Sequence, residues 1–96
     1  MLMKFEWDEA KRRVNLRKHG IDFADCPEIM QMPDSVTFLD ERGLYDEDRF
    51  RTFAWLSDQL ILIAHTAFDD EVRIISARKV KRHEQKTYLN HFGKRS

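Results

Sequence analysis

The chain has 96 residues, of which 42% are hydrophobic and 35% are charged, and its 17 Lys and Arg balance its 17 Asp and Glu. This length and composition suit a single domain with one core, expected to span residues 1–96, and exclude wholesale disorder. The one cysteine excludes an internal disulfide, no apolar run approaches the roughly 20 residues of a membrane helix, and the first residues lack a signal-peptide pattern. We therefore expect a cytoplasmic protein without membrane contact.

The first twenty residues predict a strand followed by a helix. Residues 1–7 alternate between apolar and polar side chains, which is typical of a half-buried strand. Asp8 is a good N-cap and Gly20 a C-terminal stop, so residues 9–19 should be helical. The apolar face of this helix is thin, so the helix should lie on the surface of the sheet. That face consists of Ala10 and Val14, helped by Leu16 or Ile21.

The rest of the chain predicts one short helix, four strands and a final helix. Asp22 should cap the short helix over residues 22–31, whose buried stripe is Phe23, Cys26, Ile29 and Met30. Residues 41–48 form a polar loop, the segment most expected to be mobile. Strands are expected over residues 35–40, 49–56, 60–66 and 72–79, and the final helix over residues 81–92, with Val80, Glu84, Tyr88 and Phe92 at i+4 spacing.

The elements run β-α-α-β-β-β-β-α along the chain and predict an α+β domain. We expect a small antiparallel sheet with helices packed on one face. Alternation along a strand places Arg49 and Arg51 on the same face. Arg73 and Arg78 are five residues apart in the last strand, so they fall on opposite faces unless a bulge intervenes.

Charge is strongly segregated along the sequence. Residues 1–20 carry six Lys and Arg against three Asp and Glu, and residues 72–96 carry eight against one. Residues 21–48 carry one against nine. If the two basic ends meet in space, the fold has a cationic face suited to a polyanion and an anionic middle suited to a basic partner. The alternative is that these are ordinary solvated charges.

The available side chains favour RNA chemistry without a metal ion or a cofactor. No metal-ligand spacing and no glycine-rich phosphate loop is present, and Cys26 lies on an apolar stripe where a thiol is inert. RNA can be cut without a metal ion, because its own 2′-OH is the nucleophile once a base, an acid and positive charge are supplied. His65 can take a proton role beside Arg73 if the strands are regular, and Tyr88 can reach the same surface. The alternatives are a satisfied strand histidine and a core aromatic.

Parts of the sequence resemble the BrnT family of type II toxins. The resemblance rests on residues 4–26, KFEWDEAKRRVNLRKHGIDFADC, on Arg49 after the acidic loop, and on residues 72–88, VRIISARKVKRHEQKTY. Its most specific parts are W-D-x-x-K, N-x-x-K-H-G and R-I-I-S-A-R followed by a Glu and a Tyr. These motifs occur in order and cover almost the whole chain.

The resemblance implies a fold similar to RelE- and ParE-type toxins and a ribonuclease that inhibits translation. It also implies a BrnA antitoxin with a ribbon-helix-helix domain, a dimer or higher complex with it, and contact with operator DNA only through it. Within this sequence it points to a groove formed by Lys18, His19, Arg49, Arg73 and Arg78. With the charge and strand arguments added, the expected catalytic residues are His19, Arg49, His65, Arg73 and Arg78, and the expected RNA-binding residues are Lys18, Arg51, Lys79, Arg82 and Tyr88.

Two other functions fit the same residues. The first is a module of the same fold that binds RNA or the antitoxin without cleaving. The second is an interaction protein whose acidic segment, residues 22–48, is its only functional surface.

Overall fold

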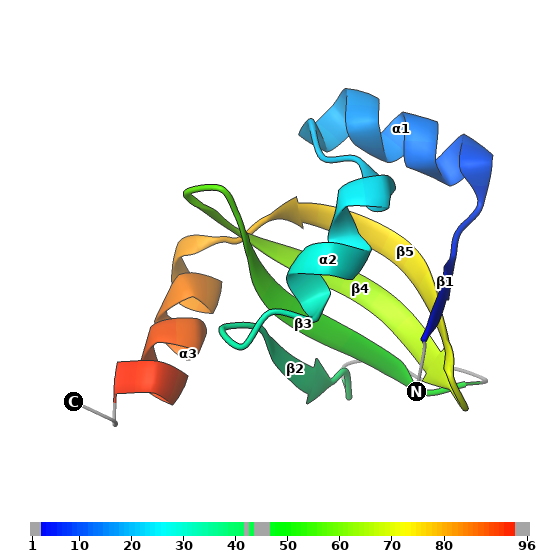
Figure 1. Ribbon diagram of the computed structural model, residues 1–96. Helices are drawn as coiled ribbons and strands as arrows, with labels where there is room; N and C mark the ends of the chain where they lie inside the picture. Colours follow the sequence, from blue (N-terminus) through cyan, green and yellow to red (C-terminus); the bar gives the residue numbers. More distant parts are fainter. Residues whose placement is uncertain (1–2, 42, 44–46, 94–96) are drawn as a thin grey trace.

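The computed structural model describes residues 3–41, 43 and 47–93. Their strands form one five-stranded sheet in the order β1-β5-β4-β3-β2, so the α+β class is confirmed (Figure 1). Much of the loop expected to be mobile, residues 42 and 44–46, lies outside the described residues. In chain order the elements are β1 (Lys4–Glu6), α1 (Glu9–His19), the 3₁₀ turn η1 (Phe23–Asp25), α2 (Cys26–Met30), β2 (Val36–Leu39), β3 (Arg49–Leu56), β4 (Gln59–Phe68), β5 (Glu71–Lys79) and α3 (Arg82–Gly93).

The sheet is mixed, which corrects the expectation of an antiparallel one. Strands β2 to β5 pair antiparallel with their neighbours. β1 runs parallel to β5, with Phe5 opposite Val72. Alternation in residues 1–7 determines which face the strand buries, but it contains no information on which edge the strand joins or in which direction.

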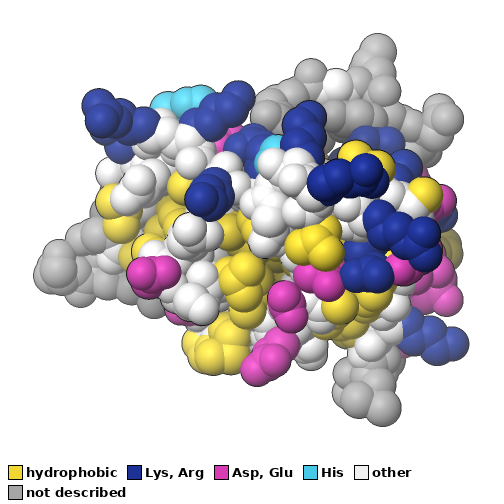
Figure 2. All heavy atoms as spheres, turned by 90° about the horizontal axis from the view of Figure 1, so that it is seen from above, with side chains coloured by type: hydrophobic (Ala, Val, Ile, Leu, Met, Phe, Trp, Pro, Cys, Tyr) yellow, Lys and Arg dark blue, Asp and Glu magenta, His cyan; other side chains and the backbone are white. Residues whose placement is uncertain are grey.

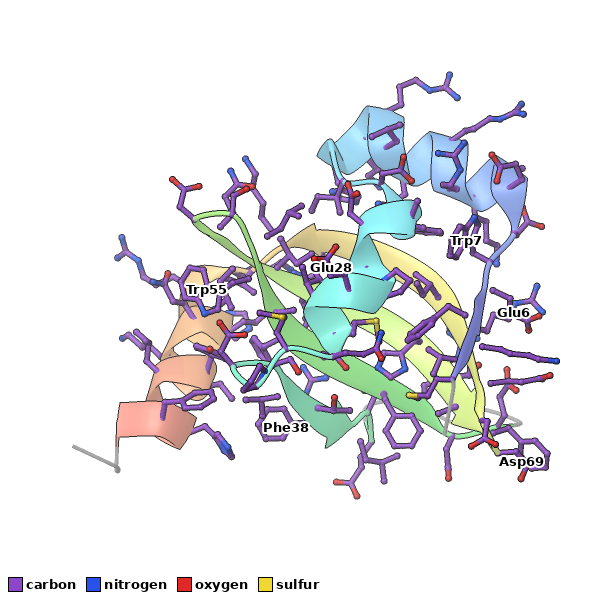
Figure 3. The ribbon with its side chains drawn as sticks, viewed as in Figure 1. Glu6, Trp7, Glu28, Phe38, Trp55 and Asp69 are labelled. Atoms are coloured by element: carbon purple, nitrogen blue, oxygen red, sulfur yellow. The ribbon has the colours of Figure 1, made fainter. Side chains whose placement is uncertain are left out.

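The helices cover both faces of the sheet, whereas we expected them on one. Phe53 and Ala54 are adjacent in β3 and point to opposite faces, and each belongs to a different buried cluster. Phe38 and Trp55, which pack against the second cluster, lie beside α3 in Figure 3. The first cluster, with η1 and α2, contains Ile21, Phe23, Cys26, Ala54, Ile61, Ile63, Ile74 and Ala77. The second, with α3, contains Val36, Phe53, Leu60, Leu62 and Tyr88.

Local signals set the helix ends where the sequence predicts them. The Asp8 carboxylate accepts a hydrogen bond from the Lys11 N–H at 3.0 Å, which caps α1. Gly20 ends α1 with a φ of 72°, a left-handed conformation that glycine adopts without steric cost. The Asp22 side chain accepts from the Ala24 N–H at 2.9 Å and begins η1.

α1 is attached to the sheet by an amide, and not by the expected apolar stripe. Val14 is 55% exposed, but Asn15 is buried. The Asn15 side chain donates to the Ala77 carbonyl at 2.8 Å and accepts from the Ala77 N–H at 3.1 Å. It also donates to the Ile21 carbonyl at 3.0 Å. Because β1 pairs only with the first residues of β5, Asn15 supplies the hydrogen bonds that a neighbouring strand would otherwise make at Ala77.

Replacing Asn15 with Ala leaves the buried N–H and C=O groups of Ala77 without these partners. We expect the free energy of unfolding to fall by about 2–4 kcal/mol, measured by urea denaturation. The matched control is Asn90→Ala, at an exposed position on α3, which should change stability by less than about 0.5 kcal/mol. Equal losses in the two variants would contradict a bracing role for Asn15.

Candidate functional site: an arginine face

A β-bulge at Ile75 changes the alternation of side chains in β5. Ala64 pairs with Ser76 and His65 pairs with Ile74, so Ile75 has no partner in β4. One extra residue shifts the alternation by one position. Ile74 and Ala77 therefore both lie in the first cluster although they are three residues apart.

The bulge brings four arginines to one face of the sheet. Arg49 and Arg73 both pair with Thr66, so the three side chains form one cross-strand row. Arg51 lies in the next row, about 7 Å along β3, and Arg78 in the row after that. This surface, formed by Arg49, Arg51, Arg73 and Arg78, is called the arginine face below. It is the face on which α3 packs, and α3 covers its Arg78 end.

The four arginines differ in their surroundings. Arg73 is exposed, whereas Arg49 and Arg51 are half-buried. The Nε atom of Arg51 is buried and has no hydrogen-bond partner among the described residues. A buried donor of this kind favours an acceptor from outside the chain, such as a phosphate oxygen.

Arg78 is held by a buried carboxylate on α3. Its two terminal nitrogens donate to the two oxygens of Glu84, each at 2.8 Å. Glu84 is only 4% exposed, and it also accepts from the Lys81 N–H at 2.7 Å. The hydrogen bonds from Arg78 lower the pKa of Glu84 to about 2, outweighing the opposing effect of burial. The pair joins α3 to β5 and fixes the orientation of the Arg78 guanidinium.

Lys18 and His19 lie at the margin of the arginine face. They line a hollow of about 350 Å³ between α1 and β5, together with Ile75 and Ser76. Ser76 belongs to the same cross-strand row as Arg51, so this hollow and the arginine face meet at β5. Figure 2, viewed from the α1 side, shows Lys and Arg side chains predominating over the upper half of that side of the molecule.

His65 is on the opposite face, away from the arginines, although we expected it beside Arg73. The bulge is the reason, because it turns Arg73 away from the face that His65 shares with Ile74. The imidazole is buried, and its Nε2 atom lies 2.7 Å from the Thr52 hydroxyl in a hydrogen bond. Burial lowers the pKa of His65, since it disfavours the charged ring.

Three predicted RNA-binding residues have other positions. Tyr88 is a core residue, and its hydroxyl donates to the Asp34 carbonyl at 2.7 Å and accepts from the Trp55 indole N–H at 2.9 Å. Lys79 pairs with Ile61, which belongs to the first cluster on the opposite face. Arg82 is exposed at the start of α3.

Cys26 is inert, as the sequence predicts. It is fully buried, and burial raises the pKa of its thiol to about 12, so the reactive thiolate is absent near neutral pH.

In the described part of the chain, no group of three or more His, Cys, Asp or Glu residues is arranged to hold a metal ion. None of the described helices is long and apolar enough to cross a membrane.

The family model described as "Ribonuclease toxin, BrnT, of type II toxin-antitoxin system" matches residues 7–84. The chain belongs to the BrnT family. The matched range contains α1, the bulge, the arginine face and the Arg78–Glu84 pair. Membership implies a ribonuclease toxin with an antitoxin partner. No curated protein sequence matches the chain.

Glu84→Gln should show how much the ion pair with Arg78 stabilises this BrnT fold. We expect a loss on the order of 2–3 kcal/mol at neutral pH. Because the pKa of Glu84 in the folded state, about 2, lies below its ordinary value of 4.5, the contribution is complete above pH 4.5 and is lost as the pH falls toward 2. The difference in stability between the two proteins should therefore narrow over that window.

Urea denaturation at several pH values measures this effect. Glu28→Gln, which changes an exposed carboxylate on α2, is the control and should leave stability nearly unchanged at every pH. The contrary result is that the free energies of unfolding of the unaltered protein and Glu84→Gln differ by the same amount from neutral pH down to about pH 2. That result would show that the charge of Glu84 does not stabilise the fold.

Proposed function

We propose that this chain is a metal-independent endoribonuclease with a RelE/ParE-like fold that inhibits translation. A BrnA-type antitoxin with a ribbon-helix-helix domain would neutralise it, and the chain would meet operator DNA only through that partner. The observation that carries the proposal is the bulge at Ile75, because it places Arg73 on the same face as Arg49 and Arg51. These three side chains lie on this face beyond the row of Phe53 and Leu62, which packs with Tyr88 of α3.

The arginine face suits an RNA backbone because its charges repeat at short intervals. Rows on the same face of β3 are about 7 Å apart, so one strand presents guanidinium groups to successive phosphates. Arginine donates in a planar fork that matches two phosphate oxygens, and the buried Nε of Arg51 adds a donor that an RNA oxygen would satisfy. Lys18 and Arg82, which lie outside this face, would contact flanking phosphates.

His19 is the best candidate for the general base. It is half-buried in the hollow between α1 and β5, next to Ser76, whereas His65 and Tyr88 are buried elsewhere with their polar atoms engaged. The imidazole there would accept the proton of the 2′-OH as this oxygen attacks the adjacent phosphate. The bond from phosphorus to the 5′-oxygen would then break, the 5′-oxygen would take a proton from solvent, and a 2′,3′-cyclic phosphate would remain. Arg51 and Arg73 would stabilise the charge that develops on the phosphorane. Arg78, held by Glu84, would act as a positioning residue.

A module that binds RNA without cleaving it is the second candidate. The observation that favours it is the burial of His65 and Tyr88, which leaves few groups able to transfer protons near the arginine face. Such a protein would bind RNA with an affinity that falls steeply as salt rises, because binding would depend on phosphate contacts.

Purified protein should cut RNA in the presence of EDTA. Arg73→Ala and His19→Ala should each lower the cleavage rate by about 100-fold, the range observed for removal of one group that stabilises a transition state. The control is Arg13→Ala, at an exposed position on α1 that does not line the hollow, and it should cleave at the unaltered rate.

The same RNA also separates the two candidates. Cleavage that is abolished by EDTA and restored by a divalent cation would refute the metal-independent mechanism. RNA that is retarded in gels without fragments would support the binding module instead. Full activity in both Arg73→Ala and His19→Ala would refute the assignment of the site.

A further inference from the structure

A second hollow lies on the face of the sheet opposite the arginines. It has a volume of about 230 Å³ and is bounded by β1, α2, β2, β3, β4 and β5. Its walls are mostly apolar, and none of the described residues that line it is an Asp, Glu, Lys or Arg. The residues that shape it most are Phe5, Met30, Phe50, Val72, Thr52 and His65.

The polar side chains that line this hollow already have hydrogen-bond partners, and Gln31 donates to the Pro27 carbonyl at 2.8 Å. The hydroxyls of Thr37 and Thr52 lie 2.7 Å apart, and Thr52 contacts His65 Nε2 at the same distance. The ring of Phe50 stacks on His65 with centroids 5.8 Å apart. An apolar side chain entering the hollow would therefore leave no polar group without a partner, whereas a charged group would find no counter-charge.

Exposed apolar side chains surround this hollow. Met3 lines it and is 46% exposed. Leu39, equally exposed, pairs with Phe50 and so lies on the same face. β2, which carries Leu39, is at the edge of the sheet. An apolar hollow with apolar side chains around its mouth is typical of a protein-binding surface.

The charges on this side select the kind of partner. Residues 21–41, which form η1, α2 and β2, contain six Asp and Glu and no Lys or Arg. Asp22 pairs with Arg12 of α1 and Asp40 is buried, so the remaining four acids give this segment its surface charge. Glu28, on α2, and Glu41, just beyond β2, are both exposed; Figure 3 labels Glu28 on α2. This surface repels RNA and attracts a basic polypeptide.

We propose that the hollow and its rim, Met3 and Leu39, bind a segment of the antitoxin. The segment would insert one large apolar side chain between Phe5, Met30 and Phe50 and place Lys or Arg residues near Glu28 and Glu41. This inference rests on the antitoxin partner of the proposed function but not on RNA cleavage. It assigns partner binding and RNA binding to opposite faces of the same sheet.

Two variants test the apolar part of the surface. Ala67→Phe fills the hollow from an exposed position on its lining, and Leu39→Lys places a charge on its rim. Each should weaken binding of the antitoxin encoded in the same operon by at least about tenfold, measured by isothermal titration calorimetry. Leu89→Lys is the matched control, because Leu89 is 50% exposed on α3, on the other side of the sheet. This variant should bind the antitoxin with unchanged affinity.

A third variant tests the charges. Glu28→Lys combined with Glu41→Lys should weaken binding and reduce its dependence on salt concentration. Asp58→Lys, in the turn between β3 and β4, reverses an exposed charge far from the hollow. This variant should change neither the affinity for the antitoxin nor its dependence on salt concentration. Thermal unfolding of every variant identifies any that fails to fold, and Leu39→Lys, at a half-exposed position, then decides the outcome alone.

Unchanged affinity in Leu39→Lys, or an equal loss in Leu89→Lys, would overturn the proposal. So would a small apolar molecule that stays bound to the protein in native mass spectrometry and is not displaced by the antitoxin. Loss of RNA cleavage has no bearing on it, since binding is measured directly. Absence of any antitoxin binding by the unaltered protein would refute both this inference and the partner in the proposed function.

Discussion

The unpaired residue Ile75 is the constraint on which both faces of the sheet depend. With a regular strand, Ile74 and Ala77 would point in opposite directions, and one of them would leave the core. The same shift determines that Arg73 and Arg78 share a face. The bulge therefore determines both which side chains of β5 pack in the first cluster and which arginines share a face. Ile75 itself lines the hollow beside α1.

Two buried polar interactions attach helices to adjacent residues of β5. Asn15 binds the backbone of Ala77, and Glu84 binds the side chain of Arg78. Asn15 replaces contacts that apolar packing does not provide, since Val14 on α1 is largely exposed. Glu84 adds to the apolar packing that α3 makes through Tyr88 and Phe92. Hydrogen bonds of this kind fix orientation more strictly than apolar contacts, which suits elements that border a functional surface.

The zero net charge of the chain conceals two surfaces of opposite character. Arginines and the last turn of α1 provide a cationic surface, while η1, α2 and β2 provide an anionic one around an apolar hollow. The sheet separates the arginine face from the anionic surface, whereas α1 meets that surface through the ion pair of Arg12 and Asp22. A toxin that must bind both a polyanion and a neutralising protein benefits from this separation, because each surface attracts one partner and repels the other.

The sequence by itself determined the helix ends, the strands, the buried thiol and the family, because caps, turns and short-range alternation depend on neighbouring residues. The unbroken apolar stretch of residues 60–64 is also typical of a strand that is covered on both faces. Only the tertiary structure decided the parallel pairing of β1, the face that α3 covers, the role of Asn15 and the separation of His65 from Arg73. These depend on strand register, which one extra residue reverses and which long-range pairing alone establishes.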